Sequence, residues 1–359
     1  MEDDKPLSES ERSSKEHYSH LEEKRKSAYD KIQGVRIVKV TKDNIVKDLI
    51  ELYKDPSISN SRLLMEIAGQ EDAVGNGVLR EAYSLFWDNL LANNTMGETE
   101  FTIPMAPHFT FEDYVSIGRI ITHQFVQCGA FPVRISQASI TQALLGDVSP
   151  ETLISSFLKL LPPREREIIE KGLSDSTAFS QDEIMEILED YNINTLPTTA
   201  NLASLITQIG RNEFAQKPYL CLLRIRRGMG PMWDGVSEKD IASIYNLCQP
   251  TTQRIIDQIY MVHKDPKDAQ IMRWLQRYLK ICSDEALVNF LRFCTATDVM
   301  RPECCIKVST EFMPPAAIRP KSRTCFGIIV LPRNYTSFTQ LRKNMDFYLR
   351  NPNLWDLSD

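Results

Sequence analysis

The sequence lacks an apolar run long enough to cross a membrane. The apolar stretch at residues 325–331 is far shorter than the roughly 18 apolar residues that a membrane span needs. The first thirty residues are charged and contain no apolar core of a signal peptide. We therefore expect no secretory leader, no membrane partner and an intracellular location, cytoplasmic or nuclear.

The eight cysteines also lack the spacing of a metal site. No two of them are separated by the short gap that is typical of a zinc knuckle. The sequence therefore predicts neither a structural metal nor a cofactor. In the reducing compartment that the missing leader indicates, we expect free thiols rather than disulfides. The open question is which of these thiols is reactive.

An excess of charge of either sign is missing as well. The 359 residues carry a net charge of −6, with 42% hydrophobic and 25% charged residues. These fractions are typical of globular proteins and exclude wholesale disorder. A net acidic chain is a poor nucleic-acid binder, so we expect no nucleic-acid partner. At about 150 residues per domain, the length predicts two or three domains.

The N-terminal segment, residues 1–33, has few apolar positions. It holds nine acidic and seven basic side chains, so we predict a disordered, solvated tail. The Lys-Arg-Lys run at 24–26 is a solvated charge cluster or a localisation signal. Order is predicted to begin with a strand at 35–40, where β-branched residues alternate with polar ones.

The rest of the chain predicts an α+β fold with two lobes. Residues 34–262 are mainly helical, with apolar faces at helical spacing in the segments 79–90 and 114–128. A polar, proline-containing break at 263–267 predicts the hinge. Residues 268–359 predict a smaller mixed α/β lobe, with strands at 304–308 and 324–331 and a last helix that begins at Ser337.

Local charge singles out Cys325. Residues 301–350 contain nine basic and three acidic side chains, a local charge of +6 in an acidic chain. Arg323 lies two positions before this cysteine, at a predicted junction between loop and strand. Neighbouring cations favour the thiolate, which is the nucleophilic form, and a junction can expose a side chain. The structural alternative, a buried and inert thiol, stays open at this point.

Histidines give no support for a protease-like dyad. All five lie N-terminal to Cys325. His123 falls within an apolar helical pattern, and we predict a buried core residue there rather than a general base. A cysteine–histidine pair of the papain type therefore has no support from the spacing.

The surroundings of Cys325 resemble the C-terminal lobe of HECT-type ubiquitin-protein ligases. The segment 322–326 (Ser-Arg-Thr-Cys-Phe), the Leu-Pro at 331–332 and the following helix are similar to that family's signature. The family often has His before Thr-Cys-Phe and Asn after it, where this chain has Arg323 and Gly327. Further resemblances precede these in the family's order, at 75–83 (Gly-Asn-Gly-Val-Leu-Arg-Glu-Ala-Tyr), 111–129, 143–146, 271–275 and 291–297. The compact form is most like the G2/M phase-specific ligase subgroup.

The resemblance implies a fold, an activity and partners. It implies a bilobal HECT-like fold whose N-lobe binds a ubiquitin-conjugating enzyme. Ubiquitin would pass to Cys325 as a thioester and then to a lysine of a protein substrate. Thr324 and Phe326 would shape the cysteine's pocket, Arg323 would favour its thiolate, and Trp355 would stand in for the family's C-terminal phenylalanine.

One alternative comes from the N-lobe. Residues 164–227 correspond to the family's small subdomain that binds the conjugating enzyme, and here they are predicted to be shorter and more helical. The alternative is a catalytically idle HECT-like module that serves in protein interaction.

Overall fold

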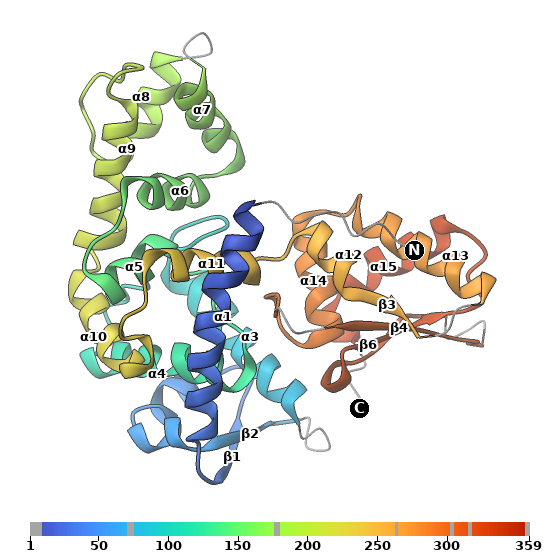
Figure 1. Ribbon diagram of the computed structural model, residues 1–359. Coiled ribbons are helices and arrows are strands. Elements are labelled where there is room, and N and C mark those ends of the chain that lie inside the picture. The colour runs from blue at the N-terminus through green and yellow to red at the C-terminus, as the bar shows by residue number, and fades with distance from the viewer. Residues whose placement is uncertain are drawn as a thin grey trace.

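The computed structural model describes residues 9–69, 75–175, 180–262, 265–301, 305–314 and 318–355. Their buried side chains form three hydrophobic cores. We call the corresponding parts the N-terminal body, the helical subdomain and the C-terminal body. Figure 1 shows the helical subdomain above the N-terminal body and the C-terminal body beside it. The fold is α+β, as predicted, with helices dominant and two small sheets.

The N-terminal body contains two parallel strands and most of the long helices. Its elements are α1 (Glu9–Asp30), β1 (Val35–Val40), α2 (Ile45–Leu52), η1 (Pro56–Asn60), β2 (Arg62–Ile67), α3 (Asn76–Asn94), α4 (Phe111–Cys128), α5 (Gln137–Leu145), α10 (Tyr219–Met229), η4 (Pro231–Trp233) and α11 (Glu238–Cys248). The strand predicted at 35–40 is confirmed, and it pairs in parallel with β2.

The helical faces predicted for α3 and α4 are confirmed. Leu79, Tyr83 and Phe86 of α3 are buried in the N-terminal core, as are Ile117 and Phe125 of α4. These positions recur every three or four residues, so one face of each helix enters the core. The helix α4 ends at Gly129, whose left-handed backbone closes the last turn.

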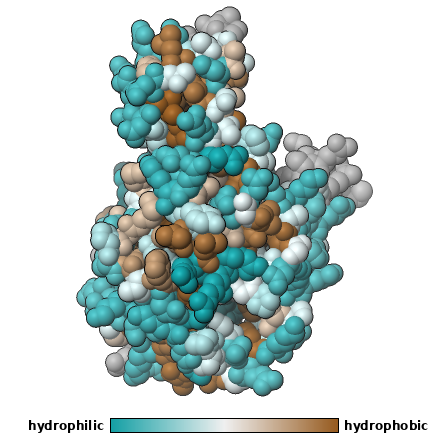
Figure 2. Space-filling model, turned by 90° about the vertical axis from the view of Figure 1, so that its left-hand side faces the viewer, coloured by the Kyte–Doolittle hydropathy of each residue, from teal (hydrophilic) through white to brown (hydrophobic). Residues whose placement is uncertain are grey.

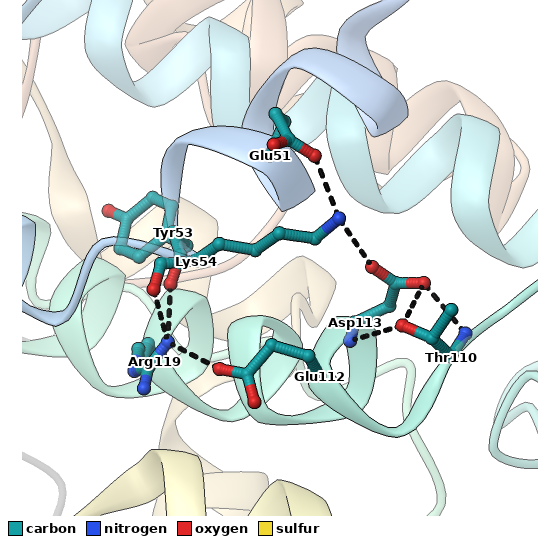
Figure 3. Close-up of polar contacts among 7 residues, drawn as sticks. All are labelled: Glu51, Tyr53, Lys54, Thr110, Glu112, Asp113 and Arg119. Carbon is teal, nitrogen blue, oxygen red and sulfur yellow. Dashed lines mark hydrogen bonds and ion pairs between the residues drawn. The ribbon is translucent and has the colours of Figure 1, made fainter.

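A group of polar contacts ties the end of α2 to α4 (Figure 3). Arg119 of α4 donates to the backbone carbonyls of Tyr53 and Lys54, at 2.7 and 3.1 Å. The Lys54 ammonium lies between Glu51 and Asp113, at 2.7 and 3.3 Å. Burial alone would raise the pKa of Asp113, but hydrogen bonds from Thr110 and the Lys54 charge outweigh it and lower that pKa. These contacts hold the first turn of α4 in place.

The prediction of a disordered tail over residues 1–33 is wrong for its described part. The helix α1 covers 9–30 and packs against α11 (Figure 1), with Tyr18 and Leu21 buried. The His17 Nδ1 lies 2.9 Å from an Asp240 oxygen in the first turn of α11. The Arg25 guanidinium donates to the Val126 carbonyl at the end of α4. The few apolar residues of this segment suffice because they fall on one face and meet a surface supplied by distant parts of the chain.

The helical subdomain contains only helices among its described residues. Its elements are α6 (Pro150–Leu160), α7 (Pro163–Ser174), α8 (Gln181–Glu189), α9 (Leu202–Arg211) and the π-helical turn η3 (Asn212–Gln216). The prediction that residues 164–227 are largely helical is therefore confirmed for the described part. Across the described ranges as a whole, no helix is both long and apolar enough to span a bilayer.

The C-terminal body is a four-stranded sheet with helices packed on it. Its elements are α12 (Thr252–Gln258), β3 (Ile259–Met261), α13 (Pro266–Leu279), α14 (Asp284–Thr295), β4 (Ile306–Glu311), β5 (Lys321–Arg323), η6 (Thr324–Phe326), β6 (Ile328–Pro332), α15 (Phe338–Leu349) and η7 (Pro352–Leu354). The strand order is β3-β4-β6-β5, with only β5 antiparallel to its neighbour.

The structure differs from the predicted hinge at 263–267. Residues 263–264 lie outside the described residues, and Asp265 caps α13. The strand β3 precedes this segment but already pairs with β4 of the C-terminal sheet. Cys248 belongs to the N-terminal core and Ile255 to the C-terminal core, so the chain passes between the bodies at 249–251. The proline at 266 begins a helix, a position that proline tolerates, instead of marking the connection.

Candidate functional site

Cys325 lies in the tight turn between the antiparallel strands β5 and β6. The predicted strand over 324–331 is therefore divided: residues 324–326 form the 3-10 turn η6, and β6 begins at Ile328. Gly327 closes the turn with a left-handed backbone, φ +63°, which glycine and asparagine adopt most readily. The turn lifts the cysteine out of the sheet, so that its side chain faces the N-terminal body.

The thiol of Cys325 meets the amino end of α3. The backbone N–H of Gly77 donates to the Cys325 Sγ at 3.3 Å. The side chain is half-buried and lines a cavity of about 430 Å³ between the two bodies. N–H groups in the first turn of a helix have no partner within the helix and favour negative charge. This environment suits a thiolate.

The cavity beside the thiol is polar and lined largely by the N-terminal body. Three arginines line it, together with one carboxylate, Glu22, which pairs with Arg25. The three arginines are Arg25, Arg80 and Arg301. None of the three belongs to the turn that carries Cys325 or to its flanking strands, and Arg25 comes from α1. The cations at the thiol are therefore mostly contributed by segments far away in the sequence.

Arg80 connects α3 to the C-terminal body at two points. Its Nε donates to the carbonyl of Thr295 at the end of α14, and its Nη2 donates to the carbonyl of Thr324 in the cysteine's turn, both at 2.8 Å. The side chain is only 6% exposed. Hydrogen bonds from a charged donor are stronger than those between neutral groups, so this buried guanidinium fixes both segments against α3.

A second polar contact between the bodies lies further along α3. Arg292 of α14 and Arg134 both pair with Asp88 of α3. Asp298 lies close by and is buried, and this burial together with the charge of Asp88 raises its pKa. The Met300 N–H donates to the Cys248 carbonyl at 2.8 Å. The two bodies are thus also joined by contacts outside the cysteine's turn.

The residues that the sequence analysis assigned to the site lie in different surroundings. Thr324 is buried, and Phe326 is 64% exposed at the edge of the cavity. Arg323 ends β5 with an exposed side chain and does not line the cavity. Trp355 packs edge-on against Phe293, and its Nε1 donates to a backbone carbonyl of α15. It contributes to the C-terminal core, and no contact with the thiol is seen.

Sequence reasoning missed the functional positions on α3. Gly77 and Arg80 contact the cysteine's turn across more than two hundred residues of sequence. Both residues lie in the segment 75–83, whose resemblance to the family predicted no role for either of them. The signal was an arginine in an otherwise apolar helical pattern, preceded by glycines at a helix start.

Five of the other described cysteines lie in or against a hydrophobic core: Cys128, Cys221, Cys248, Cys282 and Cys294. Burial raises the pKa of Cys128 to about 11 and that of Cys248 to about 12. Cys282 also has a pKa raised by burial, and Cys294 lies in the C-terminal core. Cys304 lies outside the described residues. Cys305 is exposed and lines the same cavity as Cys325, which makes it the natural control in experiments on that thiol.

His123 is a core residue, as predicted. It is 2% exposed, and its Nδ1 lies 2.7 Å from the hydroxyl of Tyr53, which in turn contacts the hydroxyl of Tyr83. Burial lowers the pKa of His123 to about 4, so it is neutral at physiological pH. In the part of the chain that the structure describes, no group of three or more His, Cys, Asp or Glu side chains is arranged to hold a metal ion.

A second surface feature is an apolar groove on the N-terminal body. Figure 2 shows the side of the molecule that carries α9 and α10, where hydrophobic residues gather near the centre of a largely hydrophilic face. The groove has a volume of about 570 Å³ and is lined by Met105, Phe109, Phe111, Tyr219 and Leu220, among others. Four of these five side chains are strongly exposed. Such a patch is typical of a protein contact surface.

Comparison with known families identifies the segment around the thiol. Residues 245–357 match the family model of the HECT-domain (ubiquitin-transferase). The matched segment begins in the last turn of α11, covers the described C-terminal body and includes Cys325. A search of curated proteins finds no match. The C-terminal body is therefore similar to the HECT-domain (ubiquitin-transferase) family.

Proposed function

We propose that this chain is a ubiquitin-protein transferase that carries ubiquitin as a thioester on Cys325 and passes it to a lysine of a protein substrate. One observation carries the proposal. Within the segment that matches the ubiquitin-transferase family, a half-buried cysteine faces a polar cavity and accepts a hydrogen bond from a helix amino end. These are the surroundings of a nucleophilic thiol, not of a structural one.

The reaction consists of two balanced transfers. In the first, the Cys325 thiolate attacks the carbonyl carbon of a thioester between ubiquitin and a conjugating enzyme; a new C–S bond forms and the enzyme's thiolate leaves. In the second, a substrate lysine amine attacks the Cys325 thioester. An amide bond forms, the Cys325 thiolate leaves, and the amine's proton goes to solvent. The covalent intermediate divides one transfer into two easier steps.

The proposed partners follow from this chemistry. They are ubiquitin, a ubiquitin-conjugating enzyme and a protein substrate, with the N-terminal body and helical subdomain receiving the conjugating enzyme. The compact, helical form supports assignment to the G2/M phase-specific subgroup. We also propose an intracellular location, in the cytoplasm or nucleus, because a free reactive thiol is maintained in a reducing compartment.

The test is reconstitution of the first transfer. The full chain is incubated with activating enzyme, a panel of conjugating enzymes, ubiquitin and ATP, and the products are separated on non-reducing gels. We expect an adduct that thiol reagents remove, present in the wild type and in Cys305→Ala and absent in Cys325→Ala. No adduct from the folded chain with any conjugating enzyme would overturn the proposal in favour of an idle interaction module.

A further inference from the structure

The contact between α3 and the cysteine's turn depends on two glycines. An ideal Cβ at Gly77 would lie 2.7 Å from the Thr324 Oγ1 and 2.9 Å from the Cys325 Sγ. A Cβ at Gly75 would lie 3.0 Å from the same sulfur. A Cβ at Gly77 would be closer than real contacts allow, and one at Gly75 would be in a tight contact, so a larger residue at either position would require the thiol to shift.

The backbone does not require glycine at these two positions. Gly75 precedes α3 with an extended backbone, φ 162°, and Gly77 lies in the first turn of the helix. Any residue adopts these conformations, and alanine is the better helix former. What glycine supplies here is space, and the atoms that use the space belong to Thr324 and Cys325.

Arg80 completes the arrangement from one turn further along α3. It binds the Thr324 carbonyl beside the cysteine and the Thr295 carbonyl at the end of α14. A lysine could reach only one of two carbonyls in this way, because it presents a single ammonium instead of a fork of donors. The two carbonyls lie in separate segments, so this side chain sets both the position and the orientation of the turn.

We propose that Gly75, Gly77 and Arg80, the α3 contact site, position Cys325 for transfer and stabilise its thiolate. Arg80 is the positioning residue, and the Gly77 N–H is the group that touches the sulfur. The inference rests on the proposed function and extends it to the N-terminal body. Cys325 is a thiolate at the start of the first transfer, where it is the attacking group. It is a thiolate again at the end of the second transfer, where it is the leaving group. A group that stabilises the thiolate promotes its departure.

Several ionisable groups besides Arg80 lie near the thiol. The ionisable groups that line the cavity besides Arg80 and Cys325 are Tyr18, Glu22, Arg25, Cys128, Arg301 and Cys305. Glu22 is paired with Arg25, so the lining retains a net positive charge without Arg80. Replacing Arg80 therefore removes one of the three arginines that line the cavity. It also removes the described hydrogen bond from α3 to the Thr324 carbonyl. Because other cations stay in place, we expect a partial effect on the pKa of the thiol.

The experiment measures alkylation of Cys325 in the full chain with iodoacetamide from pH 5.5 to 9, read by mass spectrometry of the peptide that contains it. We expect Arg80→Met to shift the midpoint of the rate–pH profile upward by about one pH unit. Arg80→Lys should fall between Arg80→Met and the wild type. The control is Arg273→Met, the same change at an exposed arginine of α13 outside the cavity, which should leave the midpoint in place.

Gly77→Ala is the second variant, since it keeps the arginine and favours the helix. We expect the same upward shift of the midpoint, with an unchanged or higher rate at high pH because the sulfur is moved from the helix. Unchanged midpoints in both variants would overturn the inference. Because alkylation requires no ubiquitin, this experiment tests the α3 contact site independently of the proposed transferase activity. A ubiquitin adduct with unchanged midpoints refutes only the α3 contact site. Shifted midpoints without an adduct support this site and refute the transferase.

Discussion

The backbone N–H of Gly77 points at the sulfur of Cys325, 3.3 Å away, although 248 positions separate the two residues in the sequence. The contact joins the amino end of the N-terminal body's α3 to the turn that carries the thiol. The turn that carries the thiol belongs to the C-terminal sheet, but the N–H group that meets the sulfur comes from the N-terminal body. We therefore expect the reactivity of this cysteine to depend on the packing of the two bodies.

Arg323 offers a comparison between charge that is near in sequence and charge that is near in space. We expect Arg323→Glu to raise the alkylation midpoint of Cys325, but only by about 0.3 pH units, because its exposed side chain is screened by solvent and salt. Alkylation profiles at low and high salt measure this. An unchanged midpoint would refute a role for Arg323, and a shift as large as that of Arg80→Met would refute the dominance of the α3 contact site.

Leu21 tests whether α1 is part of the folded domain. Its side chain is fully buried in the N-terminal core. We expect Leu21→Ala to lower the free energy of unfolding by about 2–4 kcal/mol, as at other buried leucines, measured by urea denaturation. The control is Ser19→Ala, an exposed position on the same helix. Equal stability of the two variants would show that the segment is a solvated tail.

His123 makes stability depend on pH. The unfolded chain protonates this histidine near its ordinary pKa of 6.5, while burial lowers the pKa in the folded protein to about 4. Between these values the unfolded state binds more protons, so stability falls as the pH falls. The difference corresponds to about 3 kcal/mol of unfolding free energy lost between pH 6.5 and 4.

The measurement for His123 is denaturant unfolding at several pH values, in the wild type and in His123→Gln. We expect the variant to lose this part of the pH dependence. His20→Gln, at an exposed histidine of α1, should retain it. A wild-type curve that stays flat between pH 6.5 and 4 would contradict the burial of a neutral imidazole.

Ala296 ends α14 in a left-handed conformation, φ 58°, which is unfavourable for alanine. We expect Ala296→Gly to raise the free energy of unfolding by up to about 1 kcal/mol, because relief of strain exceeds the entropy cost of glycine. Ala286→Gly within the same helix should instead lower it. Thermal unfolding of both variants checks the signs, and destabilisation by Ala296→Gly would contradict the argument.

The features that the sequence predicted are those encoded locally. The apolar spacing of α3 and α4 predicted their buried faces. The charges and the motif around Cys325 indicated it as the candidate nucleophile, which stays a prediction. The features it did not predict depend on contacts between distant segments. The burial of Leu21 could not be predicted from its own segment, because the surface that covers it comes from distant elements such as α11. Gly77 and Arg80 acquire their roles only when the turn at 324–326 is placed on them. The proline at 266 suggested a hinge, but pairing of β3 with β4 places the connection earlier.

A single-turnover experiment tests the central claim most directly. A conjugating enzyme charged with ubiquitin is mixed with the full chain and a lysine-bearing acceptor, and peptides are quantified by mass spectrometry over time. We expect ubiquitin to appear on Cys325 before it appears on lysine, and the Cys325 adduct then to decline. We also expect that neither product forms in Cys325→Ala, while Cys305→Ala behaves as the wild type. Ubiquitinated lysine that forms at the wild-type rate in Cys325→Ala would contradict the account.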